Sequence, residues 1–256
     1  MDLLHSLILG SGDRHLVVLH GFLGMGDNWK THAKRWESQG WCVHLLDQRN
    51  HGRSFWSNDF GYSFLASDLK NYLDYHKIEK CTLLGHSMGG KTAMNFSSQY
   101  PEYITQLIVA DIAPKEYNSH HQQILNGLAS LDFSELKSRS SVDLALATYV
   151  KEQSVRQFLL KNLYWEEKGK LGLRINIKVL KEAGNLIGEG LASNYIFNGP
   201  TLFLRGILSG YILDEDHLAL KHHFPNYALV DIEQAGHWLH AENPTAFLKA
   251  IEEWGV

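Results

Sequence analysis

A glycine-rich turn around Ser87 constrains the fold of this chain more than any other segment. Gly85-His86-Ser87-Met88-Gly89 fits the pattern G-x-S-x-G, with the apolar run Cys81–Leu84 before it and a helical pattern after it. A strand, a tight turn and a helix in this order lift the serine hydroxyl above the strand ends, and the glycines leave room for the bend. The sequence therefore predicts a parallel sheet with a nucleophilic Ser87 at its carboxyl edge.

The rest of the chain supports such a sheet, because short apolar runs alternate with helical patterns. Strand-like runs occupy residues 15–20, 41–46, 81–84, 106–110, 200–204 and 227–232, and helical patterns occupy residues 28–38, 62–76, 88–99 and 243–254. Continuous apolar runs of this length are typical of parallel strands covered on both faces, and the helices supply the crossovers.

The pattern changes between Pro114 and Pro200. Apolar residues three and four positions apart predict helices near residues 142–150 and 155–163, and few strand-like runs occur there. We therefore expect one α/β core, built from residues 1–114 and 199–256, with a helical cap inserted at residues 115–198.

Composition narrows the functional classes. The chain has 256 residues, 44% hydrophobic and 20% charged, which predicts a globular core rather than disorder. Its net charge of −4 argues against general nucleic-acid binding, and no apolar run approaches the roughly 20 residues of a membrane span. The first residues lack the basic start of a secretory signal, so we expect a cytoplasmic protein with Cys42 and Cys81 as buried, reduced thiols. None of the 15 histidines shows a spacing typical of a metal site, so neither metal nor cofactor is expected.

Two further segments are expected to complete a catalytic set around Ser87. His20-Gly21-Phe22-Leu23-Gly24 follows the first strand-like run, and the N–H of Phe22 can join the N–H of Met88 in an oxyanion hole. The expected base is His237, because a histidine after the last strand is its usual place in this chain order. His240 is the alternative base.

The acidic partner of the histidine is less obvious. The penultimate strand is followed by Ser209, where a carboxylate is common, and Asp214 and Asp216 come several residues later. Asp111 ends the strand directly after the strand and helix of the nucleophile, on the same edge as Ser87. We expect Asp111 to be the acid, with Asp214 or Asp216 as the alternative and the lack of any acid as a third case.

Residues beside these groups are candidates for substrate contact. In the loops at this edge they are His20, Gly21, Leu23, His86, Arg205 and Trp238. In the cap, the apolar residues that line an acyl pocket or form the cap's own core are Phe133, Tyr149, Phe158, Leu159, Tyr164 and Trp165.

The segment Asp47–Ser54 opens on the same rim. We expect Asp47 to pair with Arg49 and the loop to be held rigid by internal hydrogen bonds. Substrate contact by Asn50, His51 or Arg53 is the alternative.

Together these motifs resemble the α/β-hydrolase superfamily. The segment Asp47–Ser54, which reads D-x-R-N-H-G-x-S, with Gly85–Gly89 and Ala110–Pro114, looks like the small cytosolic esterase and acyl-CoA thioesterase branch. The resemblance extends from His20 to the final helix. It implies a mostly parallel twisted sheet with helices on both faces, a helical cap, the earlier acid at Asp111, and no cofactor or metal.

The expected activity is therefore hydrolysis by a Ser-His-Asp triad of small-molecule carboxylic esters with short-to-medium acyl chains, extending to acyl-CoA thioesters. Ser87 attacks, His237 moves the proton and Asp111 orients the histidine. Two alternatives stay open: a carbon–carbon hydrolase or cofactor-free lyase with the same triad, and a non-catalytic member that binds a ligand under the cap.

Overall fold

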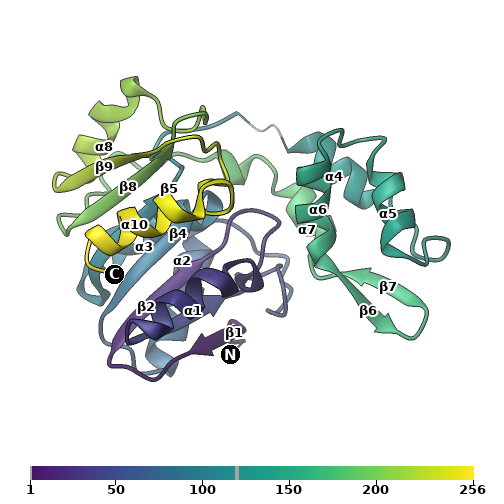
Figure 1. Ribbon diagram of the computed structural model, residues 1–256, viewed down its shortest axis with the longest axis horizontal. Helices are drawn as coiled ribbons and strands as arrows, with labels where there is room; N and C mark the ends of the chain where they lie inside the picture. The colour runs from purple at the N-terminus through teal and green to yellow at the C-terminus, as the bar shows by residue number, and fades with distance from the viewer. Residues whose placement is uncertain (1, 119–120) are drawn as a thin grey trace.

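The computed structural model describes residues 2–118 and 121–256, and its central feature is a twisted sheet (Figure 1). Within these residues the sheet has seven strands in the order β1-β3-β2-β4-β5-β8-β9. Their bounds are β1 Ser6–Leu9, β2 Arg14–Leu19, β3 Trp41–Leu46, β4 Cys81–His86, β5 Ile104–Ala110, β8 Thr201–Gly206 and β9 Tyr227–Ile232. The edge strand β1 runs antiparallel to β3, and every other pairing in the sheet is parallel.

Helices cover both faces of this sheet. One face packs against α1 Lys30–Ser38, α9 Leu239–Glu242 and α10 Pro244–Glu253, and the other packs against α2 Tyr62–Tyr75, α3 Met88–Gln99 and α8 His217–His223. Side chains of β2 alternate between the two cores: Leu16 and Val18 face the first set, and Val17 and Leu19 face the second. Successive strand residues point to opposite faces, so a strand covered on both sides is apolar throughout, as the sequence predicted.

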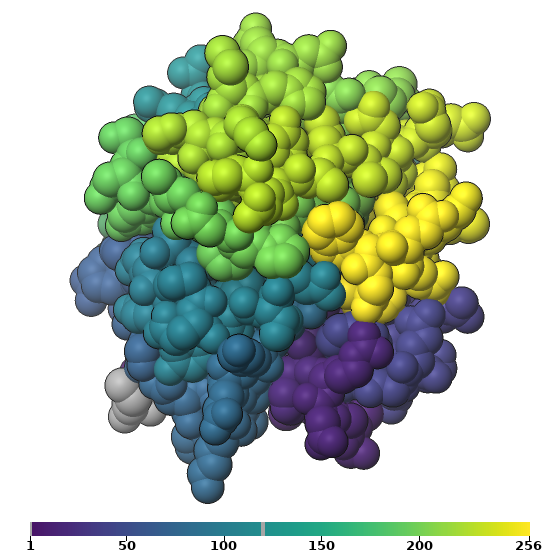
Figure 2. Space-filling model, turned by 90° about the vertical axis from the view of Figure 1, so that its left-hand side faces the viewer, coloured from purple at the N-terminus to yellow at the C-terminus, as the bar shows by residue number. Residues whose placement is uncertain are grey.

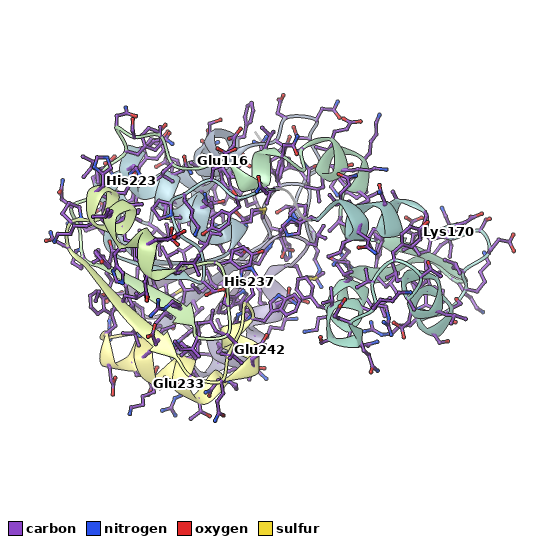
Figure 3. The ribbon with its side chains drawn as sticks, turned by 90° about the horizontal axis from the view of Figure 1, so that it is seen from above. Glu116, Lys170, His223, Glu233, His237 and Glu242 are labelled. Atoms are coloured by element: carbon purple, nitrogen blue, oxygen red, sulfur yellow. The ribbon has the colours of Figure 1, made fainter. Side chains whose placement is uncertain are left out.

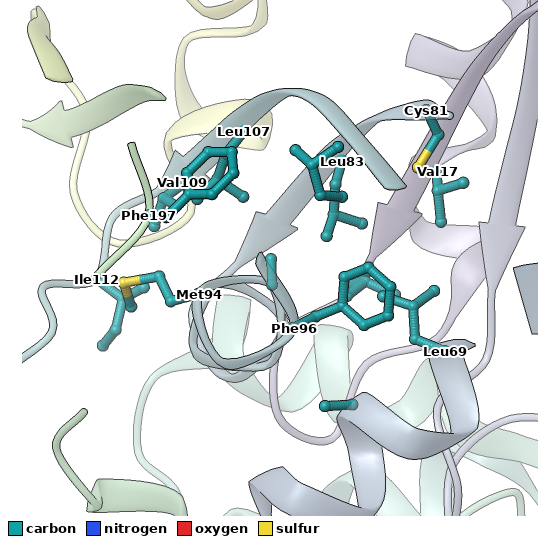
Figure 4. Packing of buried hydrophobic residues seen from close by; sticks show 14 of the residues in the cluster. Val17, Leu69, Cys81, Leu83, Met94, Phe96, Leu107, Val109, Ile112 and Phe197 are labelled. Atoms are coloured by element: carbon teal, nitrogen blue, oxygen red, sulfur yellow. The ribbon is translucent and has the colours of Figure 1, made fainter. Parts of the chain in front are cut away.

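Figure 4 shows how α3 fills the second face, with Phe96 and Met94 packed beneath the side chains of β4 and β5. Leu83, Leu107 and Val109 are fully buried there. Burying large apolar side chains in this way is worth about 1.5–3 kcal/mol each before entropy is counted, and it fixes α3 against the strand that carries Ser87 at its end.

The segment between β5 and β8 forms a separate lobe, at the right of Figure 1. It contains α4 Gln122–Ala129, α5 Arg139–Leu146, α6 Gln153–Leu159 and α7 Ile177–Glu182, and a two-stranded hairpin of β6 Leu163–Glu167 and β7 Lys170–Leu173. The helix expected near residues 155–163 is confirmed as α6 and the 3-10 turn Leu160–Asn162 that continues it, and the hairpin that follows was not predicted. The hairpin turns at Gly169, whose φ of 85° suits glycine.

Short 3-10 turns complete the element list. They are η1 Gly26–Trp29, η2 Pro101–Tyr103, η3 Leu160–Asn162, η4 Leu186–Gly188 and η5 Asp214–Asp216. The predicted strands and helices of the core are confirmed to within about two residues at each end, a normal uncertainty for element boundaries. Strand β1 was not predicted from the sequence.

A purple segment from the N-terminal part of the chain borders the yellow C-terminal segment in Figure 2. The Arg14 side chain donates a 2.9 Å hydrogen bond to the Gly255 carbonyl oxygen. Among the residues described, no helix is both long enough and apolar enough to cross a bilayer.

Candidate active site

Ser87 occupies a strained turn between β4 and α3. Its φ of 53° and ψ of −118° lie outside the regions that most residues adopt. Its N–H donates a 3.0 Å hydrogen bond to the carbonyl oxygen of Ala110 at the end of β5. A methyl group on Gly85 would lie 2.2 Å from the Gly89 carbonyl oxygen, and one on Gly89 would lie 2.4 Å from the Leu19 carbonyl oxygen. The bend therefore needs both glycines, as the sequence pattern indicates.

His237 lies within hydrogen-bonding distance of Ser87. Its Nε2 is 3.0 Å from the Ser87 hydroxyl oxygen, and its Nδ1 is 2.8 Å from the Asp111 carboxylate. Figure 3 shows His237 on the side of the core that faces the lobe, which extends away toward Lys170. The loop after β9 carries the histidine, and the His86 Nε2–H donates a 2.8 Å hydrogen bond to its carbonyl oxygen. The Tyr211 ring stacks on the imidazole, with centroids 3.8 Å apart and planes 15° apart.

Asp111 is fully buried at the end of β5 and also has a positive φ, 51°. One carboxylate oxygen accepts a 3.0 Å hydrogen bond from the Gly206 N–H, and the other accepts from the Ser209 hydroxyl as well as from His237. Ser209 stands at the position where the acid is common, and here its hydroxyl donates to the carboxylate of Asp111.

Neither alternative acid contacts His237. Asp214 is on the surface and pairs with Arg205 at 2.7 Å, and the buried Asp216 pairs with Lys115 at 2.6 Å. Asp216 also accepts a 2.8 Å hydrogen bond from the Leu213 N–H. The alternative that one of them is the acid is therefore wrong on geometry. The other base considered, His240, is buried and stacks on Trp29 with ring centroids 4.3 Å apart.

The loop after β2 lies directly against the nucleophile. A methyl group on Gly21 would lie 3.3 Å from the Ser87 Cβ, so the Phe22 backbone that follows is close to the serine. Met88 is the first residue of α3 and directly follows Ser87, and the first N–H groups of a helix have no partner within it. These are the two N–H groups that the sequence analysis expects in the oxyanion hole.

Two buried histidines hold this loop in place. His20 donates to the Gly21 carbonyl oxygen at 2.8 Å and accepts from the Gln48 N–H at 3.0 Å. His51 accepts from the Leu23 N–H at 3.3 Å and donates to the Arg49 carbonyl oxygen at 2.9 Å. Burial lowers the pKa of His20 to about 4 and the pKa of His51 to about 3. Both rings are therefore neutral at pH 7, with one donor and one acceptor each.

The segment Asp47–Ser54 is a rigid loop, but its ion pair differs from the expected one. Arg49 forms two hydrogen bonds with Asp68 of α2, at 2.5 and 2.7 Å, rather than pairing with Asp47. Asp47 instead accepts from the backbone N–H groups of Gly26 and Arg53, at 2.7 and 2.8 Å. The pairing of Asp47 with Arg49 was wrong because a helix distant in sequence supplies the carboxylate.

A cavity of about 260 Å³ lies between Ser87 and the lobe. Its apolar wall includes Phe22, Leu23, Ile124, Val155, Phe158, Leu159 and Trp238. Five of the six predicted contact residues line it: His20, Gly21, Leu23, His86 and Trp238. The sixth, Arg205, is not among the described residues that line the cavity. Its side chain forms 2.7 and 2.9 Å hydrogen bonds with Asp231, so its expected role in substrate contact is corrected to a structural one.

The six apolar residues of the lobe divide between the two expected roles. Of the six apolar residues singled out in the sequence, Phe158 and Leu159 are found among the described residues that line the cavity. Tyr164 and Trp165 are in β6, and Trp165 is 56% exposed to solvent. Phe133 and Tyr149 pack against the core of the lobe. Ile124 and Val155 also line the cavity, but neither was predicted to do so from the sequence. Ile124 lies in the amphipathic helix α4, and Val155 lies in a predicted helical segment.

A smaller cavity of about 20 Å³ also touches Ser87 and is lined by Tyr62, Lys91 and Tyr117, among others. Burial lowers the pKa of Lys91 to about 7. Its ammonium donates to the carbonyl oxygens of Lys115 and Glu189, both at 2.5 Å, one on each connection between core and lobe. The contacts of Lys91 and Tyr211, and the hydrogen bond from Ser209 to Asp111, were not predicted from the sequence, because single residues of these types carry no motif.

The sheet, the strained serine turn and the inserted lobe together define a hydrolase of the α/β class. The chain belongs to the α/β hydrolase fold family, which matches residues 14–244. It is 35% identical over 259 residues to the protein named sn-1-specific diacylglycerol lipase ABHD11 of Danio rerio, covering 98% of this chain and 81% of that protein. It is 32% identical to Esterase YbfF of Escherichia coli, covering 93% and 92% of the two chains.

Among solved structures, one named Marine microorganism esterase superimposes with a TM-score of 0.95 at 38% identity and covers 99% of both chains. These relatives support a hydrolase that acts on esters.

Proposed function

We propose that this protein is a serine carboxylesterase in which Ser87, His237 and Asp111 form the catalytic triad. The observation that carries the proposal is the continuous chain of contacts from the Ser87 hydroxyl through His237 to Asp111, at 3.0 and 2.8 Å. Such distances are those that a nucleophile, its base and an orienting carboxylate require.

In the proposed reaction His237 takes the proton of Ser87 as the serine oxygen attacks the ester carbonyl. Asp111 holds the imidazole in the tautomer whose Nε2 is free to accept that proton, and it offsets the positive charge that forms. The N–H groups of Phe22 and Met88 bind the oxyanion, and each such donor is worth about 10²–10³ in rate. His237 then protonates the leaving alcohol and activates water for hydrolysis of the acyl-enzyme.

The proposed substrate class is an ester with a short-to-medium acyl chain. The apolar wall of the cavity suits a hydrocarbon chain, and its volume of about 260 Å³ lies at the small end of ligand sites. A thioester of coenzyme A would need cationic groups for its phosphates, and Arg205, the residue considered for that role, is paired with Asp231 and Asp214. We therefore place simple esters first. Diacylglycerol, which the Danio rerio relative is named for, is a substrate to test.

The test is kcat/KM over nitrophenyl esters of increasing acyl length, with acyl-CoA thioesters and a diacylglycerol assayed beside them. Ser87→Ala is the blank. We expect an optimum among the short-to-medium esters that the variant abolishes. Turnover that persists in Ser87→Ala, or a lack of turnover on every ester, would overturn the proposal. A CoA series faster than the nitrophenyl series would overturn the preference for simple esters alone.

A further inference from the structure

Three side chains with metal-binding atoms converge at the opposite end of the sheet from Ser87. They are His15 near the start of β2, and Cys42 and His44 of β3. His15 and Cys42 are register partners in the parallel pair, so the three side chains point to the same face of the sheet. One ligand atom from each lies within 4.8 Å of the others.

The separations within this cluster are close to those of a bound metal. His15 Nδ1 is 3.0 Å from His44 Nε2, and Cys42 Sγ is 3.4 Å from the same nitrogen. A tetrahedral zinc ion with Zn–N bonds of about 2.0–2.1 Å and a Zn–S bond of about 2.3 Å holds its nitrogens about 3.3 Å apart and its nitrogen and sulfur about 3.6 Å apart. These two separations are therefore within a few tenths of an ångström of the zinc values, and the third pair, His15 and Cys42, lies within 4.8 Å.

A hydrogen-bond relay fixes the orientation of His44. Tyr72 donates its hydroxyl hydrogen to Ser6 at 2.9 Å, so its oxygen accepts from the His44 Nδ1–H at 2.8 Å. His44 Nε2 is then the unprotonated nitrogen, and it faces both His15 and Cys42. An imidazole nitrogen has one lone pair, so it accepts a hydrogen from only one of these two groups. His15 Nδ1 is the nearer at 3.0 Å, and the Cys42 thiol also donates to the Gly10 carbonyl oxygen at 3.6 Å, a hydrogen bond that metal binding would break. Metal-bound histidines in proteins are commonly oriented by such an outer partner.

We propose that His15, Cys42 and His44 bind a thiophilic divalent cation of the zinc type, with water in the fourth position. Two imidazoles and one thiolate are a donor set that favours zinc over magnesium or calcium. Binding replaces the Cys42 S–H bond by a sulfur–metal bond and releases that proton to solvent. The half-buried His15 leaves a path from solvent, whereas Cys42 and His44 are buried.

This site departs from the expectation that the chain has no metal ligands. The ligands come from two strands, with 26 residues between His15 and Cys42 and one between Cys42 and His44, so no local spacing motif reveals them. The bound ion would join β2 to β3 and would stabilise the folded chain, because the ligands are brought together by folding.

The experiment is a Co²⁺ titration of the full-length, untagged protein after treatment with a chelator, followed by absorbance. We expect one equivalent to bind and to give a thiolate-to-cobalt charge-transfer band, which Zn²⁺ then abolishes. Cys42→Ser should lose the band, and Cys81→Ser, which changes the other buried cysteine, should keep it. Zn²⁺ should raise the Tm of the wild type and of Cys81→Ser.

A second variant covers the case in which Cys42→Ser fails to fold. His15→Gln changes the half-buried ligand and should lower Zn²⁺ affinity at least tenfold in a folded protein. The proposal is overturned if Co²⁺ gives no thiolate band, if the band survives in Cys42→Ser, or if His15→Gln binds Zn²⁺ as tightly as the wild type. In those cases the cluster is a hydrogen-bond network only.

Discussion

Replacing Asp111 by asparagine tests whether this buried carboxylate orients His237 for catalysis. One oxygen of Asp111 accepts from the Gly206 N–H at 3.0 Å, and the other faces His237 Nδ1 at 2.8 Å. An asparagine keeps the first bond only if its oxygen faces Gly206, and its NH₂ group then faces His237. The opposite orientation sets two donors against each other in a fully buried place and costs about 1–3 kcal/mol. The preferred orientation therefore donates a hydrogen to Nδ1.

That orientation holds His237 in the wrong tautomer. With Nδ1 accepting, Nε2 carries the hydrogen and faces Ser87, so the base has no lone pair for the serine proton. The same change in another serine hydrolase lowers kcat by about 10⁴, which corresponds to about 5 kcal/mol of lost transition-state stabilisation. The volume of the side chain hardly changes, so the free energy of unfolding should fall far less than the activity.

The assay is kcat on a short-chain nitrophenyl ester, with the urea midpoint measured in parallel. Asp214→Asn is the matched control, because Asp214 is exposed and was the alternative acid. Asp111 is not the orienting acid if Asp111→Asn keeps more than about a tenth of wild-type kcat, or if Asp214→Asn shows the larger loss.

Three other predictions concern stability, the turn and the cavity. Burial lowers the pKa of three histidines near the site to between about 3 and 4; these are His20, His51 and His86. Below pH ~6.5 the folded protein therefore binds fewer protons than the unfolded chain. The three histidines therefore do not reduce the free energy of unfolding above that pH. As the pH drops from 6 to 5 the free energy of unfolding should fall by about 4 kcal/mol, since each group contributes up to 1.4 kcal/mol per pH unit. Equal urea midpoints at pH 7.5 and pH 5 would contradict this prediction. Gly89→Ala should lower kcat by at least a hundredfold, because its methyl group would lie 2.4 Å from a carbonyl oxygen of β2, whereas Gly210→Ala meets nothing within 4 Å and should be neutral in the same assay. Phe158→Ala should move the chain-length optimum to longer esters, and Phe133→Ala, which changes a lobe residue away from the described cavity wall, should leave it in place; the same shift in both would disprove the assignment of the cavity.

The core of the fold could be predicted because its signals are local. A strand covered on both faces is a continuous apolar run. The turn at Ser87 needs glycines because any side chain at those positions would clash with the backbone. Asp111 could be predicted for a related reason: it ends a recognisable strand, and the ends of parallel strands meet at one edge. Its place beside His237 follows from topology rather than from any spacing in the sequence.

Other features depend on contacts that the sequence does not record. Arg49 pairs with Asp68 of α2, and Arg205 pairs with Asp231 across two strands, so neither partner follows from neighbouring residues. The hairpin did have a local signal, since aromatic Tyr164 and Trp165 precede a turn at Gly169, but helical patterns around it obscured this.

Ser87 is expected to be an activated nucleophile. The most direct measurement is labelling by a fluorophosphonate, read as a mass increase of the intact protein and mapped to a residue. We expect one adduct per chain, located on Ser87, absent in Ser87→Ala, and formed at least a hundredfold more slowly in Asp111→Asn. A protein that takes up no label, or takes it up on another residue, would contradict the assignment of Ser87 as the nucleophile.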